Sequence, residues 1–458
     1  MNSSILITGI SGFVGKSLIS KLDLSKFKKI FLLIPEENIP DQFKELPDNA
    51  VIIRGDLSDP GIVEMIPEKF DTLLHMAAIT GKDKKSQYEK VNYELFRDLV
   101  ESGKGKGLKK VLFISTIAVK FRKRKRYFYS YSKEKAENFL KSSGLEFTIV
   151  RPTMILGPGS PVFKGFSMFA ELPVIPLFGG GKAIIQPVHL NDICNSVKYI
   201  LGNSVFRNEV YDLGGPDKLS IKEFFKRISE KKGKKARFLP VPMWIPVSII
   251  SVLERVLYNV LPLTLGQLAT FRNDSIADKN TLMTELSSGF SEIDEMIEES
   301  VEGEMIGHQL EKNLKECRVF TKYLIGKKPT EYNEKKYIEF LSKTNIRPLN
   351  GFDKILSGLA VKSSLLTKFC DAYSRFFFPN STLRNKLGTL FAILETSPVT
   401  YKYIDDIGEK NIFTIFILLG FRGAWFVFHL FISIFFFLPL QILTGRNKPI
   451  SKEGEELG

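Results

Sequence analysis

The sequence predicts an α/β protein built on a doubly wound parallel sheet, and two patterns carry this prediction. Short apolar runs alternate with helix-like segments from the first residues onward, and the runs are nearly continuous in apolar character, as expected for parallel strands covered on both faces. The expected strands are Ile5–Thr8, Ile30–Ile34, Val51–Arg54, Thr72–His75, Val111–Ser115 and Phe147–Val150. The expected helices between them include Phe13–Leu22, Tyr88–Ser102 and Tyr129–Ser142.

Changes in composition divide the rest of the chain. Loop signals such as Gly157–Gly159 and Gly179–Gly181 follow the last strand, and they predict a small substrate lobe folded against the sheet. Mainly helical sequence follows the lobe. We expect a sheet domain with its lobe over residues 1–240, apolar connecting helices over 241–290, a helical region over 291–410, a membrane-associated segment over 411–445, and a polar tail over 446–458.

Composition narrows the possible partners. Lysine and arginine number 65 against 51 acidic residues, which gives a net charge of +14 and favours anionic partners such as nucleotides, phosphorylated substrates or an anionic membrane. The sequence contains no recognised nucleic-acid-binding module, so nucleic acid is a less favoured partner. Three widely spaced cysteines predict a reducing compartment, and four histidines without a His-x-x-x-His pair argue against a zinc site.

A glycine loop follows the first expected strand and opens the first expected helix. Gly9, Gly12 and Gly15 are three residues apart. In this context the first glycine permits the turn, the second lets the backbone approach a diphosphate, and the third lets the helix pack on the sheet. We therefore expect a nicotinamide dinucleotide, NAD or NADP, over this loop.

The choice between NAD and NADP depends on the end of the second expected strand. A carboxylate at this point holds the ribose hydroxyls of NAD, and Glu36 is the candidate. No arginine stands there to bind a 2′-phosphate. The sequence therefore favours NAD.

Several motifs in the right order resemble the extended and atypical branches of the short-chain dehydrogenase/reductase superfamily. The resemblance covers about residues 1–240, and it is strongest to the branch that contains the NAD(P)H-binding accessory subunit of respiratory complex I. The motifs are Thr8–Gly15, Gly55–Asp59, His75–Ala78, Val91–Asn92, Phe113–Val119, Tyr129–Glu137, Arg151–Pro152 with Gly157–Pro158, and Gln186–Asp192.

This resemblance implies a Rossmann fold and a set of site residues. The implied catalytic residues are Asn92, Thr116, Tyr129 and Lys133, with Ser115 as the alternative to Thr116. The implied cofactor-binding residues are Gly9, Ser11, Gly12, Phe13, Val14, Gly15, Glu36, Asp56, Leu57, Met76, Ala77, Ala78, Lys133, Pro152 and Thr153. No metal is implied.

The tyrosine and lysine of this set have a chemical rationale. A phenol with a pKa near 10 is a poor base at neutral pH, and a nearby ammonium stabilises the phenolate. Tyr129 and Lys133 are four residues apart, so they share one helix face. Tyr131 and Lys135 have the same spacing, but the surrounding motif favours the first pair.

The residues around this pair leave two interpretations open. The basic run Lys120–Arg126 lies between Thr116 and Tyr129, and it is either a site for a phosphate or anionic headgroup or a solvated loop. For His189 and Asp192 we expect structural roles.

The segment 411–445 is almost entirely apolar. Its stretch Ala424–Leu443 approaches the ~20 residues that a membrane-spanning helix needs. A buried helix of a soluble domain is the alternative. The N-terminal apolar run is too short for a signal peptide, so we expect the sheet domain on the cytosolic face of a membrane.

Together these features predict a membrane-associated NAD(P)-dependent oxidoreductase or epimerase with tyrosine as acid/base. An apolar, lipid-linked or phosphorylated substrate is expected from the apolar C-terminal segment and the basic run. Two alternatives remain: a non-catalytic NAD(P)H-binding subunit or assembly factor of a membrane complex, and a nucleotide-sugar epimerase or dehydratase.

Overall fold

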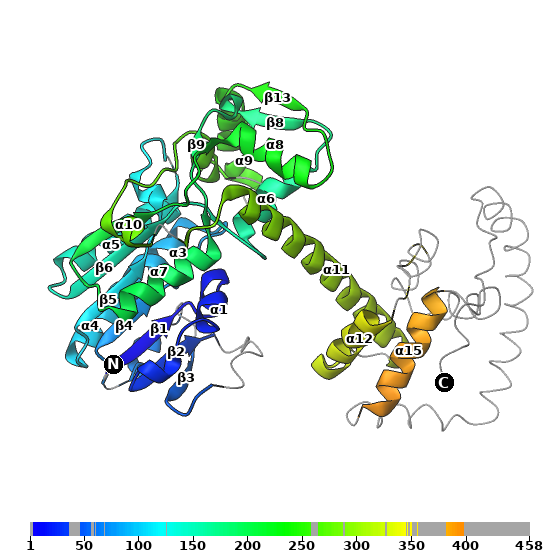
Figure 1. The fold of residues 1–458 in the computed structure, drawn as a ribbon, viewed down its shortest axis with the longest axis horizontal. Coiled ribbons are helices and arrows are strands. Elements are labelled where there is room, and N and C mark those ends of the chain that lie inside the picture. Colours follow the sequence, from blue (N-terminus) through cyan, green and yellow to red (C-terminus); the bar gives the residue numbers. More distant parts are fainter. Residues whose placement is uncertain are drawn as a thin grey trace, which may run out of the picture. The chain divides into compact units, whose positions relative to one another are not determined.

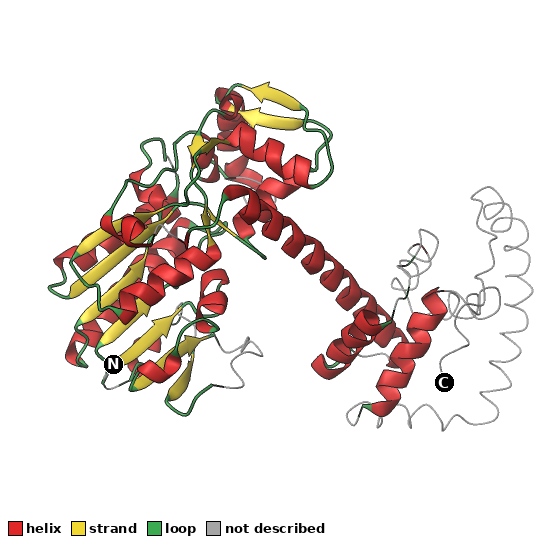
Figure 2. Ribbon diagram, viewed as in Figure 1, coloured by secondary structure: helices red, strands yellow, loops and turns green. Residues whose placement is uncertain are grey.

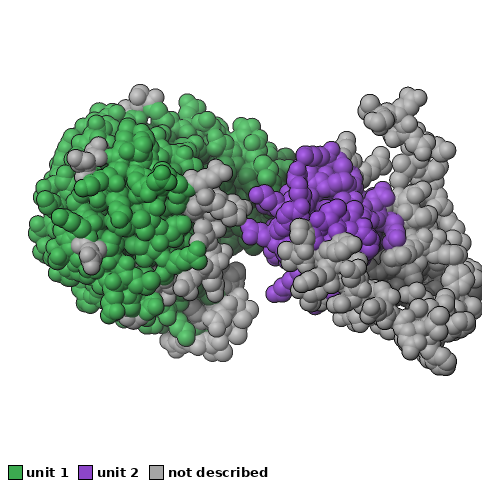
Figure 3. Space-filling view, turned by 90° about the horizontal axis from the view of Figure 1, so that it is seen from below, with its two compact units in different colours: residues 1–307 green, residues 308–458 purple. Residues whose placement is uncertain are grey.

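The structure is a computed structural model of the full 458-residue chain. It describes residues 3–35, 46–55, 59, 61–67, 69–124, 126–257, 264–286, 289–325, 328–344, 346, 349, 355 and 382–397. These residues form two compact units, 1–307 and 308–458, which Figure 3 colours separately. The segment 411–445, predicted to associate with a membrane, lies outside the described residues.

A seven-stranded parallel sheet forms the centre of the first unit, as the sequence predicts (Figures 1 and 2). Its strand order is β11-β6-β5-β4-β1-β2-β3. The chain therefore adds strands outward in one direction from β1 and in the opposite direction from β4. The strands are β1 (Ser4–Thr8), β2 (Lys29–Ile34), β3 (Ala50–Arg54), β4 (Thr72–His75), β5 (Lys110–Ile114), β6 (Glu146–Pro152) and β11 (Glu209–Leu213).

Helices cover both faces of this sheet because alternate residues of each strand point to opposite faces. Ile5 and Ile7 pack in one core with α1 (Phe13–Ile19) and α7 (Leu190–Gly202), whereas Leu6 packs in a second core with helices on the other face. Those helices are α2 (Ile62–Met65), α4 (Leu95–Gly105) and α5 (Phe128–Ser142). A short α3 (Lys85–Glu89) and a π-helical turn (Lys90–Glu94) lead into α4.

The lobe begins after β6 and has its own apolar core. Its strands are β7 (Ile155–Leu156), β8 (Ile175–Phe178), β9 (Ile184–Ile185), β10 (Val188–His189), β12 (Leu219–Ser220) and β13 (Phe238–Val241). Its helices include α6 (Pro161–Ala170), α8 (Ile221–Lys231) and α9 (Trp244–Leu257). The short turn helix Gln267–Phe271 follows them, and α10 (Thr281–Leu286) packs back on the sheet core.

The lobe extends further along the chain than residue 240, where the sequence prediction ended it. The helix α11 (Ile293–Ile325) contributes Ile293, Met296 and Ile297 to the lobe core. The acidic residues 291–304 are therefore solvated on only one face of this helix. Because the segment contains many acidic residues, its composition does not reveal the apolar face.

The described part of the second unit is helical (Figure 2). The end of α11 packs with α12 (Glu331–Lys343) and α15 (Thr382–Thr396) around Cys317, Phe320 and Leu390. This agrees with the helical region that the sequence predicts. Among the described helices, none is both long enough and apolar enough to cross a membrane.

Candidate active site

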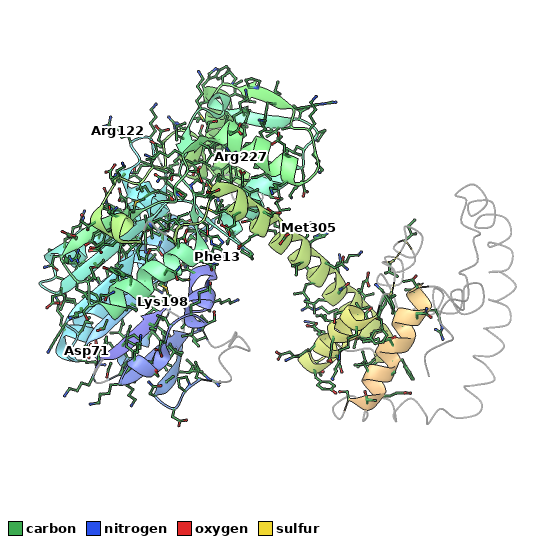
Figure 4. The ribbon with its side chains drawn as sticks, viewed as in Figure 1. Phe13, Asp71, Arg122, Lys198, Arg227 and Met305 are labelled. Carbon is green, nitrogen blue, oxygen red and sulfur yellow. The ribbon has the colours of Figure 1, made fainter. Side chains whose placement is uncertain are left out.

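The glycine loop joins β1 to α1 at the carboxyl edge of the sheet. In Figure 4, Phe13 in the first turn of α1 and Asp71 just before β4 mark the carboxyl and amino edges. Gly9 has φ +77°, and a Cβ there would lie 2.4 Å from the backbone nitrogen of Ala77. A Cβ on Gly15 would lie 2.3 Å from the carbonyl oxygen of Gly9. Both positions therefore exclude any side chain.

The middle of the loop fits a diphosphate. Gly12 is exposed, and a Cβ there would meet only the Gly9 oxygen, at 3.2 Å. Ser11, Phe13 and Val14 around it are half-buried. The backbone at the start of α1 is thus open to a ligand, with the unpaired N–H groups of the first turn behind it. These features fit the nicotinamide dinucleotide predicted from the sequence.

The other predicted cofactor residues that the structure describes follow strands at the same edge. Met76, Ala77 and Ala78 come directly after β4, where the Met76 nitrogen donates to the Thr8 oxygen at 3.2 Å. Thr153 follows Pro152 at the end of β6 and donates its hydroxyl to the Gln186 carbonyl at 2.5 Å.

Three of the predicted cofactor-binding residues belong to the adenosine end of the expected site. Glu36, Asp56 and Leu57 lie outside the described residues. Their predicted roles stay predictions.

Tyr129 and Thr116 lie together at this edge. Thr116 caps the short helix Ile117–Lys120 that follows β5, and its Oγ1 accepts from the Ala118 nitrogen at 3.3 Å. Burial raises the pKa of Tyr129 to about 12. The neighbouring Thr116 side chain has the opposite effect on this pKa, but it is smaller. The fold thus brings together the phenol and the hydroxyl that the sequence pairs.

Ser115 is engaged elsewhere, which separates it from Thr116. Its hydroxyl donates to Glu137 at 2.5 Å, and Arg151 binds the same carboxylate through Nε at 2.9 Å. Burial raises the pKa of Glu137, but the hydrogen bonds from Arg151 and Ser115 outweigh it and the net pKa is lowered. Of the two candidates that follow β5, Thr116 is the one beside Tyr129.

Lys133 is fully buried on the same face of α5 as Tyr129, with 1% of its surface exposed. Its amine lies 4.1 Å from the centroid of the Phe113 ring. Burial lowers the pKa of Lys133 to about 7, although the nearby Glu137 carboxylate raises it. The pKa of Tyr129 is raised in this structure, so burial outweighs any lowering by the Lys133 ammonium.

Asn92 connects two of the segments around the site through hydrogen bonds. Its amide nitrogen donates to the Ile79 oxygen at 3.0 Å and to the Ser132 hydroxyl at 3.1 Å, and its oxygen accepts from the Ile79 nitrogen at 2.8 Å. It sits in the π-helical turn, fully buried. These bonds tie the segment after β4 to α5, so in this structure Asn92 is a positioning residue.

The alternative pair on α5 faces outward. Tyr131 is 39% exposed, with the Arg124 guanidinium 4.7 Å above its ring, and Lys135 pairs with Glu89 on the surface. The register that buries Lys133 and partly buries Tyr129 is therefore the one that the fold adopts.

Two residues of the site were not singled out from the sequence. Tyr88 is buried, and its proximity raises the pKa of Tyr129 further. Glu137 is buried beneath Ser115. Glu137 stands four residues after Lys133, a spacing that places both on one face of α5. No comparable signal marks Tyr88.

The basic run serves mainly to connect elements of the first unit. Lys120 pairs with Asp212 and Asp278, each at 2.6 Å. Arg124 pairs with Glu134 at 2.8 Å, and Arg126 pairs with Glu254 at 3.3 Å. Much of the run's charge is therefore neutralised, which weakens its interpretation as a site for a phosphate or headgroup.

His189 and Asp192 anchor the segment that begins α11, as structural residues. His189 Nε2 lies 3.1 Å from a carboxylate oxygen of Glu299, and Asp192 accepts from the Ser291 nitrogen at 3.2 Å. Neither reaches the Tyr129 cluster through a hydrogen bond among the described residues.

The fold and this arrangement agree with a known family. Residues 5–214 match the NAD dependent epimerase/dehydratase family. The matched residues hold the sheet and the first part of the lobe, and this part of the chain is similar to the family. Its description names NAD, the cofactor that the sequence favours. The match includes the glycine loop, Thr116 and the α5 pair.

Similar proteins differ in what they do. The chain is 22% identical, over 63% of its length and 73% of the relative's, to subunit 9 of the NADH dehydrogenase [ubiquinone] 1 alpha subcomplex of Arabidopsis thaliana mitochondria. It is 26% identical, over 53% of its length and 80% of the relative's, to the UDP-glucose 4-epimerase of Vibrio cholerae. The structure of a nucleoside-diphosphate-sugar epimerase from Staphylococcus aureus shares the fold, with a TM-score of 0.53 at 19% identity over 65% of this chain and 100% of that one.

Proposed function

We propose that the N-terminal domain is an NAD-dependent epimerase or oxidoreductase that transfers hydride at a carbinol or carbonyl carbon of a sugar linked to a diphosphate. The observation that carries the proposal is the proximity of the Thr116 hydroxyl to the Tyr129 phenol at the same sheet edge as the glycine loop. The family match supports the cofactor, and the UDP-glucose 4-epimerase relative supports the substrate class. Bound NAD supplies the hydride acceptor.

In this proposal Tyr129 moves the proton. With a pKa of about 12 the phenol stays protonated at neutral pH and can donate a hydrogen bond to a carbonyl oxygen. To accept a proton from a carbinol, its pKa must fall toward neutrality. The Thr116 side chain already acts in this direction, and a charge on Lys133 would add to it.

Lys133 is suited to this task because its pKa is about 7. Near neutral pH the amine exists in both protonation states, so a modest change in its surroundings changes its charge. A hydroxyl group of a bound ligand near the amine would stabilise the ammonium and, through it, the Tyr129 phenolate.

The second candidate is a domain that holds a nucleotide without turnover. Two observations favour it: the Lys133 amine lies over the Phe113 ring, and one relative is a subunit of NADH dehydrogenase. This candidate predicts bound cofactor and no reaction.

The test uses purified full-length protein, its released cofactor, and a panel of UDP-hexoses. Turnover that is lost in Tyr129→Phe but kept in Tyr131→Phe supports the enzyme, because the control removes the same hydroxyl from the exposed side of the same helix. Full turnover in Tyr129→Phe refutes the assignment. Cofactor release without turnover in the natural protein favours the holding domain.

We further propose that the domain works at the cytosolic face of a membrane and acts there on a diphosphate-linked substrate that can be lipid-linked. The apolar segment 411–445 motivates this proposal. Deletion of Asn411–Gly458 should release most of the protein from the membrane fraction of cells. Undiminished pelleting with membranes would count against the segment as the main anchor.

A further inference from the structure

The helix α9 exposes a stripe of large apolar side chains. Trp244 is 70% exposed, Ile249 53% and Val252 64%. Together with Ser248 these positions follow a helical spacing that places them on one face. No charged residue stands between Trp244 and Val252 in the sequence. A soluble helix normally shows charged or polar residues on its outer face. We therefore expect a binding partner to cover the exposed apolar side chains of α9.

The ribbon of β8 and β13, at the outer edge of the lobe in Figure 1, precedes α9 in the chain and also exposes apolar side chains. Leu239 is 57% exposed and pairs in register with Pro176, two residues after the half-exposed Val174. Arg237 stands two residues before Leu239, so both side chains leave the strand on the same face. Trp244 follows the end of β13 by three residues, within ~10 Å of chain reach.

A group of unpaired cations stands beside the apolar residues. Lys234, Lys235 and Arg237 are exposed, and within the described part of the chain their side chains form no ion pair or hydrogen bond. The cations just before them differ, because Lys231 pairs with Glu298 and Lys232 with Glu304. The positive charge at the start of β13 is thus left for a partner.

We propose that this surface, made of Leu239, Trp244, Ile249 and Val252 with Lys234, Lys235 and Arg237, docks the lobe on an anionic phospholipid membrane. Tryptophan beside aliphatic residues inserts at the headgroup level, and lysine and arginine next to it bind anionic headgroups. A protein partner would need acidic groups and a complementary shape, whereas a lipid surface needs only the apolar area and the charge that are present.

The proposal deepens the membrane association proposed above, but it stands on different residues. The segment 411–445 would tether the chain, and the lobe surface would fix the orientation of the first unit on the membrane. The deletion test of the segment 411–445 does not measure contact between the lobe surface and lipid. The segment and the surface therefore need separate experiments.

The experiment uses the full chain with Trp425→Phe, because the sequence has two tryptophans and this change leaves Trp244 as the only one. Vesicles of phosphatidylcholine are compared with vesicles that also contain phosphatidylglycerol, with and without lipids brominated on their acyl chains. We expect the Trp244 emission to shift to shorter wavelength and to be quenched by the brominated lipids only when phosphatidylglycerol is present. High salt should weaken the effect, since the screening length falls to about 3 Å at 1 M.

Two variants in this background test the two halves of the surface. Changing Lys234, Lys235 and Arg237 to glutamate should lower the vesicle affinity measured by quenching by at least about a hundredfold, since each cation near an anionic surface contributes about 1 kcal/mol. Val252→Glu should also abolish the quenching. Met65→Glu is the control, because Met65 is an exposed apolar residue on another helix, α2, at 52% against 64% for Val252.

Two results would overturn the proposal. One is unquenched, unshifted Trp244 emission while the protein pellets with anionic vesicles, because the lobe surface then does not touch the lipid. The other is a Trp244 shift that depends on protein concentration without vesicles, because a second copy of the chain would then be the occupant. Circular dichroism of each variant confirms that a loss of quenching is not a loss of folding.

Discussion

Replacing Lys133 by methionine should stabilise the protein while it impairs the proposed reaction. Lys133 is buried on α5, with its amine against the Phe113 ring. Methionine keeps a long apolar stem and removes only the group that burial disfavours. The substitution therefore separates the packing of the side chain from the cost of its charge.

The magnitude follows from the pKa of about 7 for a group whose ordinary value is 10.5. At about 1.4 kcal/mol per pH unit, the buried amine costs up to ~5 kcal/mol at pH values below 7, relative to pH above 10.5 where it is neutral in both states. The sign is fixed by linkage: between these pH values the unfolded chain binds a proton that the folded chain does not, so stability rises with pH. Repacking around methionine offsets up to ~1.5 kcal/mol of the gain.

Urea unfolding followed by far-ultraviolet circular dichroism at pH 7 and pH 9.5 measures the effect. The stability gain of Lys133→Met over the natural protein should shrink by roughly 3 kcal/mol between these values, with most of the gain present at pH 7. Lys135→Met is the control on the same helix, because it removes an exposed lysine and should change stability by less than ~1 kcal/mol at both pH values. A gain for Lys133→Met that does not depend on pH would refute the burial of the amine.

Two further predictions address the glycine loop and the end of β5. Gly9→Ala should abolish cofactor binding, measured by the fluorescence of added NADH, and destabilise the fold by more than ~2 kcal/mol, because its Cβ would meet the Ala77 backbone at 2.4 Å; binding at the natural affinity would show that the loop can shift. Ser115→Ala should lower the free energy of unfolding by ~1–3 kcal/mol, because it removes a buried hydrogen bond to Glu137, whereas Thr116→Ala should slow turnover with little effect on thermal melting. The reverse pattern would exchange the roles of these two residues.

Local patterns were sufficient for the sheet domain. Each predicted strand from Ile5 to Val150 appears as a strand, because a continuous apolar run in a parallel sheet is buried on both faces and leaves little choice of structure. The glycine spacing likewise predicted the turn at Gly9, where the structure has φ +77°. The lobe was harder, because part of its core comes from α11, more than fifty residues after β13 in the sequence.

In the candidate site, too, some features followed from local sequence spacing and others from contacts between distant residues. Spacing placed Tyr129 and Lys133 on one helix face, and a family motif proposed Thr116. Which of Ser115 and Thr116 meets the phenol depends on Glu137 and Arg151, which bind Ser115 from α5 and β6. The spacing also did not predict that the Lys133 amine lies over the Phe113 ring.

The sequence by itself determined the order of the strands and helices, the glycine turn and the residue types at the site, because these depend on neighbours within a few positions. Only the tertiary structure decided which polar groups pair, which cations of the basic run are neutralised, and which apolar residues of α9 remain uncovered. The physical reason is that burial and charge pairing depend on residues far apart in the chain, as in the ion pairs of Lys120 with Asp212 and Asp278. No local pattern records such contacts.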